Sequence, residues 1–149
     1  MTLSLWMLLG FVGWTVFVLL VGVGSYRWSL ILAGKASLAS FPGDTPHGSV
    51  AYRRCVRAHA NCVENLPVFA AIVLTAAGAH VAPAHMGALA TAVVAARVLQ
   101  SSTHMLFPET NITVSVRFTF FLIQIVAMIA MGVLIDRCPL GPDTKACAG

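Results

Sequence analysis

One stretch of the chain carries charged and polar side chains at the spacing of a helix face. Four of them are separated by three, four and three residues: Arg54, Arg57, Asn61 and Glu64. That spacing places them on one side of a helix. Glu64 lies about two turns inside an apolar segment, where an ionisable group usually faces the bundle interior or a water-filled cavity. The pattern fits an internal salt bridge, such as Arg57 with Glu64, as well as it fits a binding site.

Two further arginines lie within apolar segments. Arg97 is about 13 Å from one end of its segment, and Arg117 is within about two turns of the start of the last one. Together with Arg57 and Glu64, they are expected to share one half of a helical bundle. Because an unfilled positive pocket is costly, three arginines against one glutamate predict an anionic ligand. The guanidinium fork suits a carboxylate in particular.

Four apolar segments are long enough to span a bilayer, which takes about 20 residues. We predict helices over about 3–24, 57–81, 86–107 and 113–135. A long loop, about 26–54, follows the first helix, and Asn111 is expected to cap the last one. The other connections are short, so sequential helices are antiparallel neighbours. The predicted fold is an all-α integral membrane protein, an up-down four-helix transmembrane bundle, with a single domain over 1–149.

The composition agrees with a membrane protein. The 149 residues are 58% hydrophobic and 9% charged, with a mean hydropathy of +0.87. Soluble domains carry about 25% charged residues, so the lipid bilayer is the expected partner of much of this surface. The net charge is +4, but the chain has no basic run with interleaved aromatic residues, and we expect no nucleic acid partner. No cysteine or histidine cluster has metal-ligand spacing, so no metal is predicted.

The distribution of lysine and arginine predicts the topology. These residues concentrate in the first loop and its flanks, whereas the N-terminus and the loop between the second and third helices hold none. The positive-inside rule then makes the first loop cytoplasmic and both termini periplasmic, in a bacterial inner membrane. On this topology Cys138 and Cys147 face an oxidising compartment, where they could form a disulfide.

The pattern Arg54-x-x-Arg57-Ala58-His59-x-Asn61-x-x-Glu64-Asn65 resembles the signature of the MAPEG family, the membrane-associated proteins in eicosanoid and glutathione metabolism. It is similar in particular to microsomal glutathione transferase, and Arg97, His104 and Arg117 also resemble family positions. The resemblance implies a homotrimer that binds glutathione between subunits, open to the cytoplasmic side. It implies that glutathione contacts Arg57, Asn61, Glu64, Arg97 and His104. Arg117 would be catalytic and stabilise the thiolate, and Glu64 would pair with the amino group of the ligand.

Two positions depart from the prostaglandin synthase branch of that family. Gln100 stands where that branch has histidine, and Phe121 stands where it has tyrosine. These differences argue against prostaglandin or leukotriene chemistry. The main hypothesis is a glutathione transferase or peroxidase that acts on a lipophilic second substrate, an electrophile or a lipid hydroperoxide. The alternative, which the same differences favour, is a non-catalytic accessory or structural subunit of a larger membrane complex. A small transporter with Glu64 as coupling site is a third hypothesis, disfavoured because no second buried acid is present.

Overall fold

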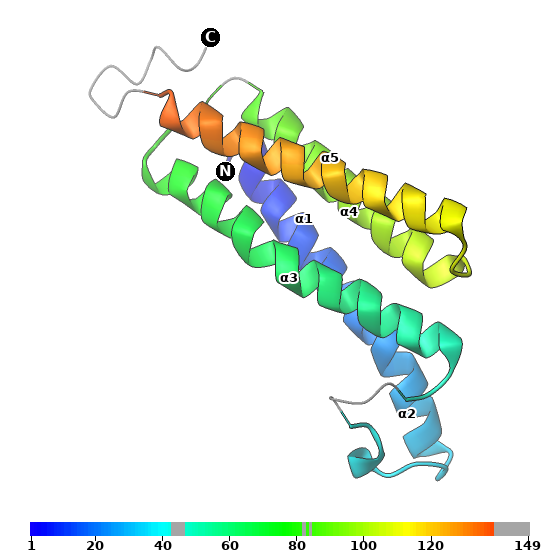
Figure 1. The fold of residues 1–149 in the computed structure, drawn as a ribbon. Helices are drawn as coiled ribbons and strands as arrows, with labels where there is room; N and C mark the ends of the chain where they lie inside the picture. Colours follow the sequence, from blue (N-terminus) through cyan, green and yellow to red (C-terminus); the bar gives the residue numbers. More distant parts are fainter. Residues whose placement is uncertain (43–46, 82, 84, 139–149) are drawn as a thin grey trace.

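The computed structural model describes residues 1–42, 47–81, 83 and 85–138, and within these ranges every regular element is helical. The long helices lie side by side and run alternately up and down (Figure 1). The N-terminus lies at the same end as the connection between α3 (Val50–Gly78) and α4 (Met86–Leu106). The turn from α4 to α5 (Asn111–Asp136) lies at the opposite end. This arrangement confirms the predicted all-α four-helix bundle.

The first helix is longer than the predicted 3–24. It runs on through α1 (Leu3–Phe17), the π-helical segment η1 (Val18–Gly24) and α2 (Ser25–Leu32). It ends where Gly34 adopts a left-handed φ of 65° and the Lys35 amide donates to the Leu30 carbonyl over 2.9 Å. The apolar part of the sequence ends before the helix does. The helix itself ends at this glycine turn, where a backbone amide beyond the helix donates to one of its last free carbonyls. None of the residues of α2 is buried, and α2 extends past the other helices (Figure 1).

The second long helix, α3, begins at Val50 and not near residue 57. Its start is set by Ser49, whose Oγ accepts a hydrogen bond from the Tyr52 amide over 3.2 Å. Such a side-chain cap satisfies a backbone donor of the first turn and so begins the helix upstream of its apolar part. The first helix approaches α3 closely at Gly22, where an added Cβ would lie 3.1 Å from the Cβ of Cys55.

The third long helix, α4, is the central one and the most polar inside. Among the residues that the structure describes, three helical segments are long and apolar enough to cross a membrane, namely Leu3–Leu32, Val50–Gly78 and Asn111–Asp136. α4 is not among them, although it was predicted to span as well. It packs against α1, α3 and α5, and it buries four polar side chains, Arg97, Gln100, Ser101 and His104. Because these face neighbouring helices and not lipid, α4 needs less hydropathy than its neighbours. The chain is thus an integral membrane protein with three candidate spans.

The hydrophobic core joins the four helices along their length. It includes Leu8 and Phe11 of α1, Cys62, Phe69 and Val73 of α3, Ala90 and Val93 of α4, and Ala127, Met128 and Met131 of α5. Phe11 and Phe69 meet with ring centroids 5.7 Å apart. Most of the other large apolar side chains point outward, as expected for a surface that faces lipid.

The turn before α5 is closed by two threonines. The Thr113 amide donates to Oγ1 of Thr110 over 3.2 Å, and the Thr110 amide donates to Oγ1 of Thr113 over 2.8 Å. This reciprocal pair is a capping box. The prediction that Asn111 caps this helix is therefore wrong, because Asn111 is its first residue and Thr110 is the cap.

The cysteines fall into two groups. Cys55 and Cys62 on α3 are free thiols. Cys147 lies outside the described residues, so its pairing with Cys138 stays a prediction.

Candidate functional site

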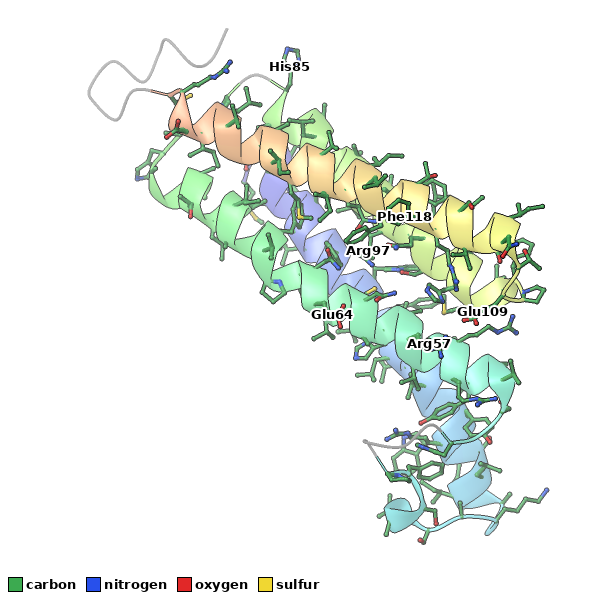
Figure 2. All side chains as sticks on the ribbon, viewed as in Figure 1. Arg57, Glu64, His85, Arg97, Glu109 and Phe118 are labelled. Carbon is green, nitrogen blue, oxygen red and sulfur yellow. The ribbon has the colours of Figure 1, made fainter. Side chains whose placement is uncertain are left out.

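Polar side chains gather at the end of the bundle where α4 turns into α5. The start of α3 supplies Arg57, the last turn of α4 supplies His104, and the start of α5 supplies Arg117. The turn itself supplies Glu109. Figure 2 shows Arg57 and Glu109 facing each other at this end. Antiparallel packing is the cause, because it brings the start of α3, the end of α4 and the start of α5 to the same end.

Arg117 is held between two neighbours. Its Nη1 lies 2.8 Å from Nδ1 of His104 and 3.8 Å from Oε1 of Glu109, and its side chain is 12% exposed. A guanidinium only donates hydrogen bonds, so the His104 ring accepts at Nδ1 and carries its proton on Nε2. A neutral imidazole beside Arg117 orients the guanidinium without adding a second cation.

Arg57 is the second cation at this end, and it is far more open. Its Nη1 lies 2.8 Å from Oε1 of Glu109, and its side chain is 66% exposed. One carboxylate oxygen thus faces both Arg57 and Arg117. The structure brings together three of the site residues predicted from the sequence, Arg57, His104 and Arg117, and it does so around an acid to which the sequence analysis assigned no role.

Arg97 lies apart from this cluster, inside the bundle. It is 1% exposed, and its Cζ lies 5.7 Å from the centroid of the Phe11 ring. Its Nε and Nη2 have no hydrogen-bond partner within the described ranges. A buried guanidinium with unused donors is costly unless an acceptor satisfies it, so Arg97 is suited to bind an anionic group.

The polar face predicted on α3 does not point into the bundle of a single chain. Glu64 is exposed and Asn61 is half-buried, whereas Ala58 and Cys62 on the other side of α3 are buried. The Asn61 carbonyl accepts a hydrogen bond from Nδ2 of Asn65 over 2.9 Å. The expectation that Glu64 faces the interior is therefore wrong for one chain, because small and apolar side chains occupy the inner face of α3. The side chains of Glu64 and Arg57 are therefore both accessible from outside the single chain.

Two glutamines support the backbone that carries Arg117. Nε2 of Gln100 donates to the Arg117 carbonyl over 3.2 Å, and Nε2 of Gln124 donates to Oε1 of Gln100 over 3.0 Å. Gln124 also donates to the Phe120 carbonyl over 3.0 Å. Gln100, which departs from the prostaglandin synthase pattern, is thus part of the structure behind Arg117. The sequence did offer a signal for this role, because Gln100 lies within an apolar helix and a buried amide needs hydrogen-bond partners. Phe121, one turn after Arg117, offers no hydroxyl group.

The arrangement is suited to bind an anion. Arg57 and Arg117 come from different helices and converge at one end, where Nη1 of each faces Oε1 of Glu109. A cation close to a thiol stabilises the thiolate, which is the nucleophilic form. Within the residues that the structure describes, no group of three or more histidine, cysteine, aspartate or glutamate side chains could hold a metal ion.

The comparisons with known proteins give one match. The MAPEG family matches the chain over residues 3–135, a segment that contains Arg57, Arg97, Glu109 and Arg117. No curated protein and no solved structure matches the chain. The family match confirms the resemblance found in the pattern that begins at Arg54.

Proposed function

Because the chain belongs to the MAPEG family, we propose that it is a membrane-bound glutathione transferase or peroxidase. Its substrates are glutathione and a lipophilic electrophile or lipid hydroperoxide that partitions into the bilayer. One observation carries the proposal. Arg117 is a cation only 12% exposed, oriented by His104 over 2.8 Å and supported at its carbonyl by Gln100.

The role of Arg117 is to stabilise the thiolate of glutathione. A free thiol has a pKa of about 8.5, and a nearby cation lowers it toward neutrality. The thiolate attacks an electrophilic carbon, so that a C–S bond forms and the leaving group departs with its bonding pair. With a hydroperoxide, the thiolate attacks oxygen, the O–O bond breaks, and an alcohol and a sulfenic acid result. A second glutathione then reduces the sulfenic acid to the disulfide and water.

The remaining predicted residues bind glutathione. Arg57 binds a carboxylate of glutathione through two parallel N–H groups of its guanidinium. Glu64 forms an ion pair with the amino group of glutathione, and this role accounts for an acidic residue within an apolar helix. Asn61, Arg97 and His104 complete the contacts. Because Arg57 and Glu64 are exposed in a single chain, we place glutathione between neighbouring subunits of a homotrimer, so that a second copy covers this side of α3.

The test is the absorbance difference of bound glutathione near the thiolate band at neutral pH. We expect a thiolate signal in the wild type and none in Arg117→Ala. Turnover of a chromogenic electrophile should fall by about 100-fold or more in that variant, the loss typical for removing a group that stabilises developing charge. The matched control is Arg53→Ala, which removes an exposed arginine one turn before Arg57 that takes no part in the ion pairs with Glu109. Full signal and turnover in Arg117→Ala would contradict the proposal.

One observation favours the alternative of a non-catalytic accessory subunit. Arg117 already has partners within the chain, His104 at 2.8 Å and Glu109 at 3.8 Å, and Phe121 provides no hydroxyl beside it. A wild type that gives no thiolate signal, binds no glutathione and co-purifies with a fixed membrane partner would support this alternative.

A further inference from the structure

Glu109 occupies a position that the proposed reaction leaves unexplained. Its Oε1 lies 2.8 Å from Nη1 of Arg57 and 3.8 Å from Nη1 of Arg117. The same carboxylate oxygen therefore faces both of the cations that converge at this end of the bundle; Figure 2 shows Glu109 beside Arg57. An anionic group of a ligand that binds Nη1 of both arginines takes the place of this oxygen.

The backbone that carries Glu109 is well braced, whereas its side chain is free to leave. Oγ1 of Thr113 donates to the Pro108 carbonyl over 2.8 Å, and the capping box of Thr110 and Thr113 closes the other side of the turn. Glu109 stands between these anchored residues, and its side chain is 47% exposed. A rotation of its side-chain torsions is therefore enough to move the carboxylate away from Arg57 and Arg117.

The pairing is weak enough to be broken by a ligand. Arg57 is 66% exposed, and an exposed ion pair contributes little because water screens it. The contact with Arg117 is longer, at 3.8 Å, although Arg117 is only 12% exposed. Glu109 thus balances the two cations when the site holds no other anion, without being fixed there.

We infer that Glu109 determines the affinity and the selectivity of the site, as an internal anion that competes with the anionic groups of the ligand for Arg57 and Arg117. The identity of the ligand rests on the proposed function, but the competition applies to any small anion. A simple monocarboxylate only replaces one carboxylate by another and gains little. Glutathione carries two carboxylates and a thiolate, so it offers further contacts after Glu109 is displaced.

The test compares anion binding by wild type and Glu109→Gln, which removes the charge and keeps the shape. Two probes are titrated, sulfate and glutathione, and the dissociation constant is taken from the rise in unfolding temperature of the detergent-purified protein. We expect Glu109→Gln to bind sulfate about fivefold more tightly, the limit set by an exposed ion pair. The gain should vanish when Arg117→Ala is added to Glu109→Gln.

The matched control is Asp136→Asn, which makes the same change in net charge at an exposed residue at the far end of α5. It should leave the affinity for sulfate unchanged. Glu109→Asp is the second variant, in case Glu109→Gln does not fold. Its shorter side chain keeps the charge but reaches the arginines less well, so it should also bind sulfate more tightly than the wild type.

The outcomes separate this inference from the proposed function. Tighter sulfate binding in Glu109→Gln with no glutathione binding in any variant would support the competition and overturn the proposed function. Sulfate binding that is unchanged or weaker in the folded Glu109 variants, or a gain equal to that of Asp136→Asn, would overturn the inference even if glutathione binds.

Discussion

At the scale of single residues, the bundle contains two kinds of arginine. Arg117 donates a hydrogen bond from Nη1 to Nδ1 of His104 over 2.8 Å and lies 3.8 Å from the carboxylate of Glu109. Arg97 is 1% exposed, with Nε and Nη2 unpaired among the described residues. An unpaired buried charge destabilises the fold unless it serves another purpose. The purpose proposed here is binding an anionic group of glutathione.

The first prediction concerns the cost of burying Arg97. Arg97→Met keeps a long side chain and removes the charge, so the empty protein should become more stable by about 1–4 kcal/mol. The measurement is thermal unfolding in detergent, with and without glutathione. The stabilisation that glutathione gives the wild type should be reduced in the variant. Arg53→Met, at an exposed arginine, is the control and should change stability by about 0.5 kcal/mol or less. A lower unfolding temperature for Arg97→Met would mean that its contact with the Phe11 ring supports the core.

At the scale of elements, α4 and α5 form the unit that positions Arg117, the cation to which we assign thiolate stabilisation. The Thr110 capping box sets where α5 begins, and the glutamine pair sets how α5 sits on α4. Gln124 reaches Gln100 over 3.0 Å, and Gln100 reaches the Arg117 carbonyl over 3.2 Å. A shift of α5 along α4 breaks both hydrogen bonds, so this pair fixes the register of the two helices.

The second prediction tests this register by a double-mutant cycle. Gln100→Leu and Gln124→Leu each leave a buried polar partner unsatisfied, which should cost about 1–3 kcal/mol of stability. The double variant should lose less than the sum, because it removes both ends of their shared hydrogen bond. Either single variant should also weaken the thiolate signal, since Arg117 loses its backbone support. Thr119→Val, at an exposed position of α5, is the control. Strict additivity of the two losses would show that the glutamines do not act together.

At the scale of the whole molecule, a single chain exposes the carboxylate of Glu64 on a surface that would face lipid. Glu64 is exposed on α3, and large apolar side chains such as Val63 and Val68 are exposed beside it. A carboxylate facing hydrocarbon is costly, so a further protein surface is expected to cover it. The proposed homotrimer supplies that surface.

The third prediction is therefore about assembly. Native mass spectrometry of the purified protein should show a complex of three times the 15.7 kDa chain mass. Glu64→Leu should shift the population toward smaller species, because a separated chain no longer exposes a carboxylate to lipid. Val68→Leu, a neighbouring exposed apolar position, should leave the complex intact. A monomer in the wild type would contradict the placement of the ligand between subunits.

The fourth prediction is about orientation in the membrane. The end of α2 and the start of α4 lie at opposite ends of the bundle (Figure 1). In a background without the four native cysteines, Lys35→Cys after α2 and His85→Cys before α4 therefore place single thiols at exposed positions on opposite sides. A membrane-impermeant maleimide should label His85→Cys in intact cells and Lys35→Cys only after the membrane is opened. This follows from a cytoplasmic first loop rich in basic residues. The reverse pattern would place the arginine site on the outer side.

The sequence alone was sufficient for the properties that depend on neighbours along the chain. Long apolar runs indicate helices that cross a membrane, and the spacing of Arg57, Asn61 and Glu64 indicates a shared helix face, because both follow from the rise and period of one helix. Helix ends were predicted less well. The first helix and α3 extend into the predicted loop because a glycine turn and the Ser49 cap set their ends, while hydropathy reports only the apolar part.

Only the tertiary structure decided which faces point inward and which distant residues meet. Glu64 shows an outward face and Arg97 an inward one, although both are charges within apolar helices. The contact of Glu109 with Arg57 joins residues 52 positions apart. Helical periodicity fixes the relative positions of side chains on one helix, but the rotation of that helix about its axis is set by packing against the other three. For this reason the sequence pattern identified Arg57 and Arg117 as site residues but did not predict their contact with Glu109. That contact depends on how α3, α4 and α5 pack against one another.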